Sequence, residues 1–131
     1  MASVVLVSLQ SARKKGNDTR VTSDVQQLRT QLESDYNGTT NYGAGFSAAN
    51  TFVSTTGTNY ATLTGDATSQ GGAINVVTTG TYPNITAYAI YGLLPSTKDT
   101  VTLANQRYFC IDSTGKTNPS AAGYTGIACP Q

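Results

Sequence analysis

The stretch that decides the fold runs from Val21 to Tyr36 and reads VTSDVQQLRTQLESDY. Its apolar residues recur at steps of three and four, which is the spacing of one face of an α-helix. These residues are Val21, Val25, Leu28, Leu32 and Tyr36. We expect this face to pack on the rest of the protein, because a helical stripe of this kind is stabilised mainly by burial.

The apolar stripe continues toward the N-terminus, so we predict one helix over residues 2–36, ended by Asn37-Gly38 and weakened or bent near Gly16. At 1.5 Å per residue such a helix is roughly 50 Å long, whereas a compact domain of this size has a radius of gyration of roughly 14 Å. We therefore expect residues 17–36 to pack on a sheet and residues 2–12 to project. The projecting apolar residues, a surface for docking to a membrane or to other chains, are Val4, Val5, Leu6, Val7, Leu9 and Ala12.

Charged residues follow the apolar N-terminal segment. The pairs Arg20/Asp24 and Arg29/Glu33 are spaced four residues apart, and we expect them to form ion pairs on the solvent side of the helix. The basic residues are candidates for contact with nucleic acid or lipid headgroups, or form a solvated collar between the projecting helix and the head. They are Arg13, Lys14, Lys15 and Arg20.

The remainder, residues 37–131, reads as a globular head. We interpret residues 37–72 as a connecting region rich in Gly, Thr, Asn and Ser, with one helical turn near 48–53. Residues 73–112 predict antiparallel strands at 74–79, 85–91, 100–103 and 107–112, with a hairpin turn at 104–106. The order helix, loop and strands predicts a single α+β domain with a long N-terminal helix on a sheet of about four strands.

The two cysteines, Cys110 and Cys129, allow one intrachain pairing. If bonded, they fix the C-terminal loop, residues 110–129, to the head and contribute on the order of 3 kcal/mol in an oxidising compartment. The alternative is a pair of free thiols. A Cys-x-x-Cys redox or metal site is excluded by the spacing.

The composition argues against enzymes. The chain of 131 residues has no histidine, so histidine-based nucleophile pairs and histidine-ligated zinc are excluded. The 8 basic and 7 acidic residues give a net charge of +1, which disfavours a nucleic-acid binder that relies on high positive charge. No calcium-loop motif surrounds Asp66, Asp99 or Asp112. We expect no catalytic residues, no metal site and no cofactor.

Both ends of the chain strongly resemble bacterial type IV pilins and type II secretion pseudopilins. The helix residues that carry the resemblance are Ala2-Ser-Val-Val-Leu-Val-Ser-Leu-Gln-Ser-Ala-Arg13, Asn17-Asp-Thr-Arg20, Ser23-Asp24, Leu28-Arg29, Leu32-Glu33 and Tyr36. The segment Tyr108-Phe-Cys-Ile-Asp-Ser-Thr-Gly115 with Cys129 is similar to the disulfide-bounded loop of type IV pilins. Residues 37–90 match only in layout.

The resemblance implies a pilin fold and a structural subunit of an extracellular filament that serves adhesion, motility or DNA uptake. It implies assembly with other pilin subunits by helix packing, an assembly machinery, and an inner-membrane-anchored precursor. The family begins with a basic leader, a cleavage site and an apolar half-helix; Met1-Ala2 falls partway through that half-helix, so we expect a truncated start. The alternatives are a secretion pseudopilin, or a surface module that binds a receptor, a glycan or DNA.

Overall fold

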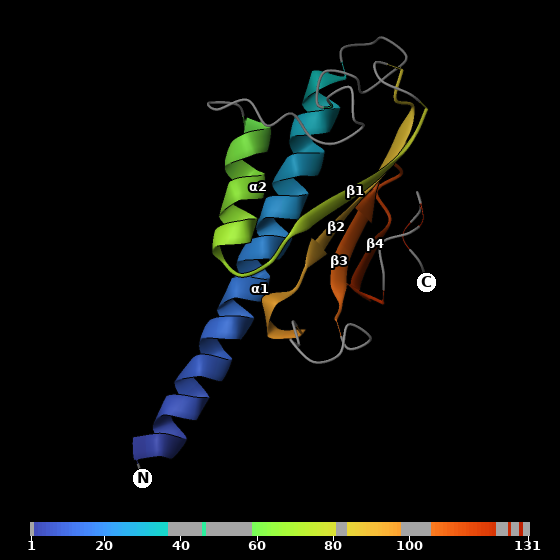
Figure 1. Ribbon diagram of the computed structural model, residues 1–131. Helices are drawn as coiled ribbons and strands as arrows, with labels where there is room; N and C mark the ends of the chain where they lie inside the picture. The colour runs from blue at the N-terminus through green and yellow to red at the C-terminus, as the bar shows by residue number, and fades with distance from the viewer. Residues whose placement is uncertain are drawn as a thin grey trace.

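The computed structural model describes residues 2–36, 46, 59–80, 84–97, 106–122, 126 and 129, with residues 2–11, 35 and 120 described by their backbone alone. Helices α1 (Ala2–Asp35) and α2 (Asn59–Ser69) lie beside one another on one side of a four-stranded antiparallel sheet (Figure 1). The predicted α+β class and the antiparallel four-stranded sheet are confirmed.

Helix α1 has 34 residues and continues through Gly16 without interruption. Its residues Val21, Val25, Leu28 and Leu32 are fully buried, and the last three share a cluster with Tyr88, Ile90, Phe109 and Ile111 of the sheet. Tyr36 follows the last helical residue and is 37% exposed, whereas the four aliphatic residues of the stripe are fully buried.

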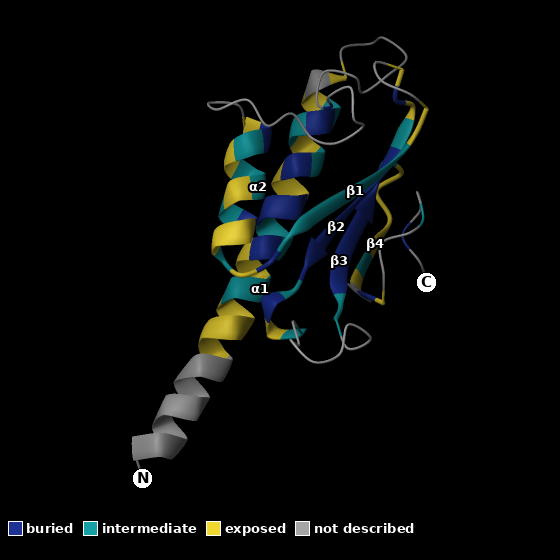
Figure 2. Cartoon of the chain, in the orientation of Figure 1, coloured by how far each residue is buried: buried dark blue, intermediate teal, exposed yellow. Residues whose placement is uncertain are grey.

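The four strands are adjacent in chain order: β1 (Ile74–Thr79), β2 (Ala87–Leu93), β3 (Tyr108–Asp112) and β4 (Thr117–Ala121). The central strands β2 and β3 are buried on both faces (Figure 2). Alternate residues face opposite sides of a strand. Accordingly, Ile90 and Ile111 belong to the cluster under α1, whereas Tyr91 and Cys110 belong to a second cluster that includes Cys129. Cys129 of the C-terminal segment therefore packs on the face of the sheet opposite the helices.

The helix α2 corrects the interpretation of residues 37–72 as a connecting region. Its sequence, NYATLTGDATS, is rich in threonine and includes glycine, so its intrinsic helix propensity is low. Tyr60, Leu63 and Ala67 nevertheless follow helical spacing, and α2 packs mainly against α1. Tertiary burial thus outweighs propensity here. The helical turn expected near 48–53 lies outside the described residues.

The sheet also corrects the predicted hairpin. Strand β1 has the predicted bounds, and β2 is shifted by two residues from the predicted 85–91. Strand β3 pairs with β2 on one side and with β4 on the other, so residues 107–112 do not form the predicted hairpin with 100–103, which lies outside the described residues. The sequence TNPSA of β4 was missed because it lacks apolar alternation; its Pro119 is tolerated because β4 is an edge strand.

The two ion pairs predicted on the solvent side of α1 are wrong. Asp24 is only 4% exposed, and Arg20 pairs with Asp66 of α2 instead. Arg29 donates from Nε to the main-chain oxygen of Asp112 at 3.3 Å, and Glu33 accepts a hydrogen bond from the Tyr88 hydroxyl at 2.8 Å. Arg20, Arg29 and Glu33 thus connect α1 to other elements of the head.

Gly92 of β2 lets α1 approach the sheet closely. A Cβ atom at this position would lie 2.6 Å from Cγ2 of Val25 and 2.9 Å from Cγ1 of Val21. Both methyl groups belong to β-branched side chains whose rotamers are restricted in a helix. The absence of a side chain at Gly92 thus leaves the space that Val21 and Val25 of α1 occupy.

We expect Gly92→Ala to lower the free energy of unfolding by about 1–3 kcal/mol, because the added methyl group overpacks the contact between α1 and β2. Gly65→Ala is the matched control, since a Cβ at Gly65 of α2 meets no atom within 4 Å. This control should raise the stability by about 0.4–1 kcal/mol. Urea denaturation of both variants measures the difference, and equal stabilities would contradict the close packing at Gly92.

Candidate functional site around the disulfide

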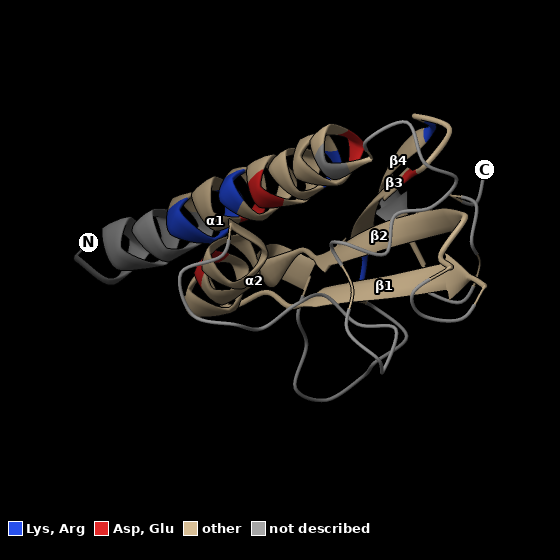
Figure 3. Ribbon diagram, turned by 90° about the horizontal axis from the view of Figure 1, so that it is seen from above, with Lys and Arg blue, Asp and Glu red and all other residues tan. Residues whose placement is uncertain are grey.

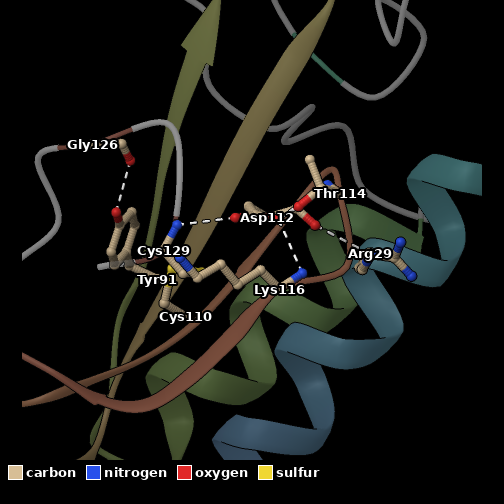
Figure 4. The surroundings of a disulfide bond; sticks show 8 residues. All are labelled: Arg29, Tyr91, Cys110, Asp112, Thr114, Lys116, Gly126 and Cys129. Atoms are coloured by element: carbon tan, nitrogen blue, oxygen red, sulfur yellow. Dashed lines mark hydrogen bonds between the residues drawn. A yellow bond between two sulfur atoms is a disulfide. The ribbon is translucent and has the colours of Figure 1, made fainter. Parts of the chain in front are cut away.

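The C-terminal segment is bonded to β3 by a disulfide between Cys110 and Cys129 (Figure 4). The two Cα atoms are 5.7 Å apart, and both cysteines are buried. Cys110 lies directly opposite Tyr91 of β2 in the sheet register. The disulfide therefore holds Cys129 against the central strand β3, on the sheet face opposite the helices.

Asp112, at the end of β3, is a second attachment point for the same segment. Its carboxylate is buried, and Oδ2 accepts a hydrogen bond from the main-chain nitrogen of Cys129 at 3.0 Å. Oδ1 accepts from the main-chain nitrogens of Thr114 at 3.0 Å and Lys116 at 3.1 Å, and from the Thr114 hydroxyl. One side chain thus shapes the turn between β3 and β4 and fixes Cys129 beside it.

Two opposing effects act on the pKa of Asp112. Burial by itself raises the pKa, but the hydrogen bonds from Thr114, Cys129 and Lys116 outweigh it, so the pKa lies below the ordinary value for aspartate. The carboxylate is therefore ionised at neutral pH. Because the folded-state pKa is depressed, its contribution to stability is present above the unfolded-state pKa and is lost as the pH falls through the folded-state value.

Tyr91 provides a third attachment. Its hydroxyl donates a hydrogen bond to the main-chain oxygen of Gly126 at 2.7 Å. Burial raises the pKa of the phenol, so the hydroxyl remains a donor at neutral pH. The ring of Tyr91 also packs edge to face on Tyr108, with centroids 6.5 Å apart. The disulfide, Asp112 and Tyr91 together define what we call the C-terminal anchor.

The turn of the anchor also touches α1. Arg29 donates to the main-chain oxygen of Asp112, and its guanidinium lies beside Gly115, where a Cβ would be 3.3 Å from Nη2. Gly115 has a φ of +90°, which favours glycine. The anchor thus connects the C-terminal segment, the sheet and α1. Sequence reasoning found the cysteines but missed these roles of Asp112 and Arg29, because Cys129 is 17 residues from Asp112 and Asp112 is 83 residues from Arg29 in the chain.

The predicted projecting segment and basic collar lie on the N-terminal half of α1. The backbone of residues 4–12 is helical, and the side chains from Ala12 to Lys15 are exposed. Arg13, Lys14 and Lys15 therefore face solvent, and Arg20, which is also exposed, pairs with Asp66 at 2.9 Å. Figure 3 shows these charges along α1, while the described strands carry few.

The described residues contain no group of three acidic, cysteine or histidine side chains that could hold a metal ion. Asp66 and Asp112 are engaged in hydrogen bonds, and Asp99 lies outside the described residues. In the described part of the chain, no helix combines the length and the apolar character needed to cross a bilayer.

Comparison of the chain with protein-family models, with curated proteins and with solved structures finds no match.

We expect Asp112→Asn to lower the free energy of unfolding at pH 7 by about 2–3 kcal/mol, because an amide nitrogen would face a main-chain donor and the ionic hydrogen bonds would be lost. Lys116→Ala is the matched control, since only the main chain of Lys116 bonds to Asp112. That control should change stability by less than about 0.5 kcal/mol. Urea denaturation at pH 7 tests both, and an unchanged Asp112→Asn variant would refute the role of this carboxylate.

Replacing both cysteines by serine should lower the free energy of unfolding by about 3 kcal/mol, since the bond closes a loop across a sequence separation of 19 residues. The same loss should follow reduction of the natural chain by dithiothreitol, measured by urea denaturation with and without reductant. Mass spectrometry after alkylation provides the check on the bond itself. Alkylation of both cysteines without reductant would contradict the disulfide.

Proposed function

We propose that the protein is the structural subunit of an extracellular filament of the type IV pilus kind. The observation that carries the proposal is the length of α1 relative to the head. On the N-terminal side, the first described side-chain contact between α1 and the rest of the head is that of Asp18, which accepts hydrogen bonds from the main-chain nitrogen and the hydroxyl of Ser96. From Asp18 back to Ala2 the helix continues for about 24 Å.

The projecting half of α1 is suited to pack among copies of itself. Its sequence from Ala2 to Leu9 is almost entirely apolar, whereas the exposed residues that follow it, Arg13 to Lys15, are basic. In a filament, the apolar segments would form a central bundle stabilised by about 25 cal/mol for each Å² of apolar surface buried. A helix inserted among its neighbours makes a heterologous contact, which propagates without closing into a ring.

The C-terminal anchor supports an extracellular placement of the head. A disulfide persists in oxidising compartments, and the anchor holds the C-terminal segment at two residues, Cys129 and Gly126. In the proposed filament, the helix bundle is central and the sheet faces outward. The segment on the outer face of the sheet would then be the surface that meets neighbouring subunits or targets.

The test is to join an apolar helical segment of about 20 residues ahead of Ala2 and to examine the extended protein by electron microscopy after removal of detergent. We expect filaments of uniform width. In the same extended chain, replacing Val5 and Leu9 by aspartate should abolish them, because the assembly would bury unpaired charges. Arg13→Ala is the matched control and should leave the filaments intact.

An extended chain that remains monomeric would contradict the proposal. Filaments that persist after the aspartate substitutions would also contradict it, because assembly would then use a surface other than the projecting helix.

Deleting residues 2–12 should leave a folded head, since the described core on α1 begins at Val21. Circular dichroism and urea denaturation of the deleted chain check this division.

A further inference from the structure

Asp24 is a buried carboxyl group at the contact between α1 and α2. The side chain is 4% exposed, and its Oδ2 atom is fully buried without a hydrogen-bond partner among the described residues. The carboxyl of Asp66 on α2 acts on it, because hydrogen bonding to Asp66 and the charge of Asp66 are among the causes that raise the pKa of Asp24. A hydrogen bond between two carboxyl groups requires one proton, because two carboxylates offer only acceptors.

The surroundings decide which of the two groups holds the proton. Arg20 forms a bidentate ion pair with Asp66. Its Nε atom lies 3.1 Å from Oδ2 of Asp66, and its Nη2 atom lies 2.9 Å from Oδ1. This pairing favours the ionised form of Asp66. Asp24 is more deeply buried and has an oxygen without a partner, both of which favour its neutral form. The proton therefore belongs to Asp24.

We propose that the contact between α1 and α2 is closed by a proton: neutral Asp24 donates a hydrogen bond to the carboxylate of Asp66, and loss of that proton loosens α2 from α1. The ionised pair would place two negative charges together at a buried contact. Arg20 compensates only in part, since its side chain is 60% exposed. We expect α2 to be the element that moves away, because it is short and packs mainly on α1.

The other described charges near this contact do not replace the missing proton. On α1, Asp18 is bonded to Ser96, and Glu33 accepts from Tyr88. On β3, which also packs on α1, the only charged group is Asp112, whose carboxylate is directed to Cys129 and the turn. Strand β2, the 3-10 helix η2 (Pro95–Thr97) and the remainder of α2 have no charged residue. Arg20 and Asp66 are thus the charged groups that act on Asp24.

The expected pH window follows from these contacts. Burial, followed by the hydrogen bond and the charge of Asp66, raises the pKa of Asp24 from the ordinary 3.8 to about 7, and the charge of Arg20 opposes these effects. Hydrogen bonding to Asp24, together with Arg20, lowers the pKa of Asp66. Since the folded state binds the proton more tightly than the open state, stability falls as the pH rises from about 4 toward 7 and is lowest above that.

Hydrogen exchange of the α2 amides measures this opening. Between pH 5.5 and pH 8.5, the protection factors of α2 should fall by about 30-fold if Asp24 titrates at 3.8 when open and at about 7 when closed. Amides of β2 and β3 should lose less protection, because α2 opens without the sheet. Protection factors, which correct for the intrinsic pH dependence of exchange, are the quantity to compare.

Asp24→Asn is the decisive variant, because the amide donates a hydrogen bond to Asp66 at every pH. Its α2 protection should remain within about threefold between the two pH values. Glu33→Gln is the matched control: it removes another carboxylate from α1 and keeps the oxygen that accepts from Tyr88, so it should show the full loss. Carbon-13 NMR titration of the Asp24 carboxyl in the natural chain gives an independent midpoint, expected well above 5.5.

Three results would overturn the proposal. One is α2 protection that does not change between pH 5.5 and pH 8.5 in the natural chain. Another is the same pH-dependent loss in Asp24→Asn, which would assign the effect to a different group. The third is an Asp24 midpoint near 4 in the NMR titration, which would show that the buried carboxyl is ionised at both pH values.

Discussion

The structure depends on the burial of β2 and β3 on both faces. These two strands contain Ile90 and Ile111 on one face and Tyr91 and Cys110 on the other, so neither face can be left to solvent without exposing a large apolar surface. The valines and leucines of α1 cover one face. On the other face, Cys129 of the C-terminal segment belongs to the buried cluster. The N-terminal helix and Cys129 thus pack on opposite faces of the same two strands.

The two buried aspartates, Asp112 and Asp24, differ in how fully their carboxyl oxygens are hydrogen-bonded. The carboxylate of Asp112 lies where a turn and the C-terminal segment converge, and main-chain donors surround it. Asp24 lies between two helices whose main-chain donors are already used within the helices. It therefore depends on a side chain, Asp66, and on a proton. The two buried aspartates consequently respond to pH in opposite directions.

Helix α1 has two parts, a C-terminal part that packs on the head and an N-terminal part that extends away from it. Residues from Val21 to Leu32 contribute to the core, and Asp18 and Arg20 connect the helix to η2 and α2. N-terminal to these contacts, residues 12–16 are exposed. One half of the helix packs on the head, and the other half extends from it. A projecting helix of this kind can insert among neighbouring subunits, and this geometry is the basis of the proposed filament function.

The sequence by itself determined the elements whose signals are local. The spacing of Val21, Val25, Leu28 and Leu32 specified α1 and its buried face, apolar runs specified β1 and β3, and the two cysteines allowed one bond. Tertiary structure decided what depends on partners distant in the chain. It made a helix of the threonine-rich residues 59–69, added the edge strand β4, and bonded Arg20 and Arg29 to Asp66 and Asp112 rather than to their helical neighbours. The reason is physical: periodicity reports which face of an element is apolar, whereas the packing of elements decides which polar groups are buried and which partners they find.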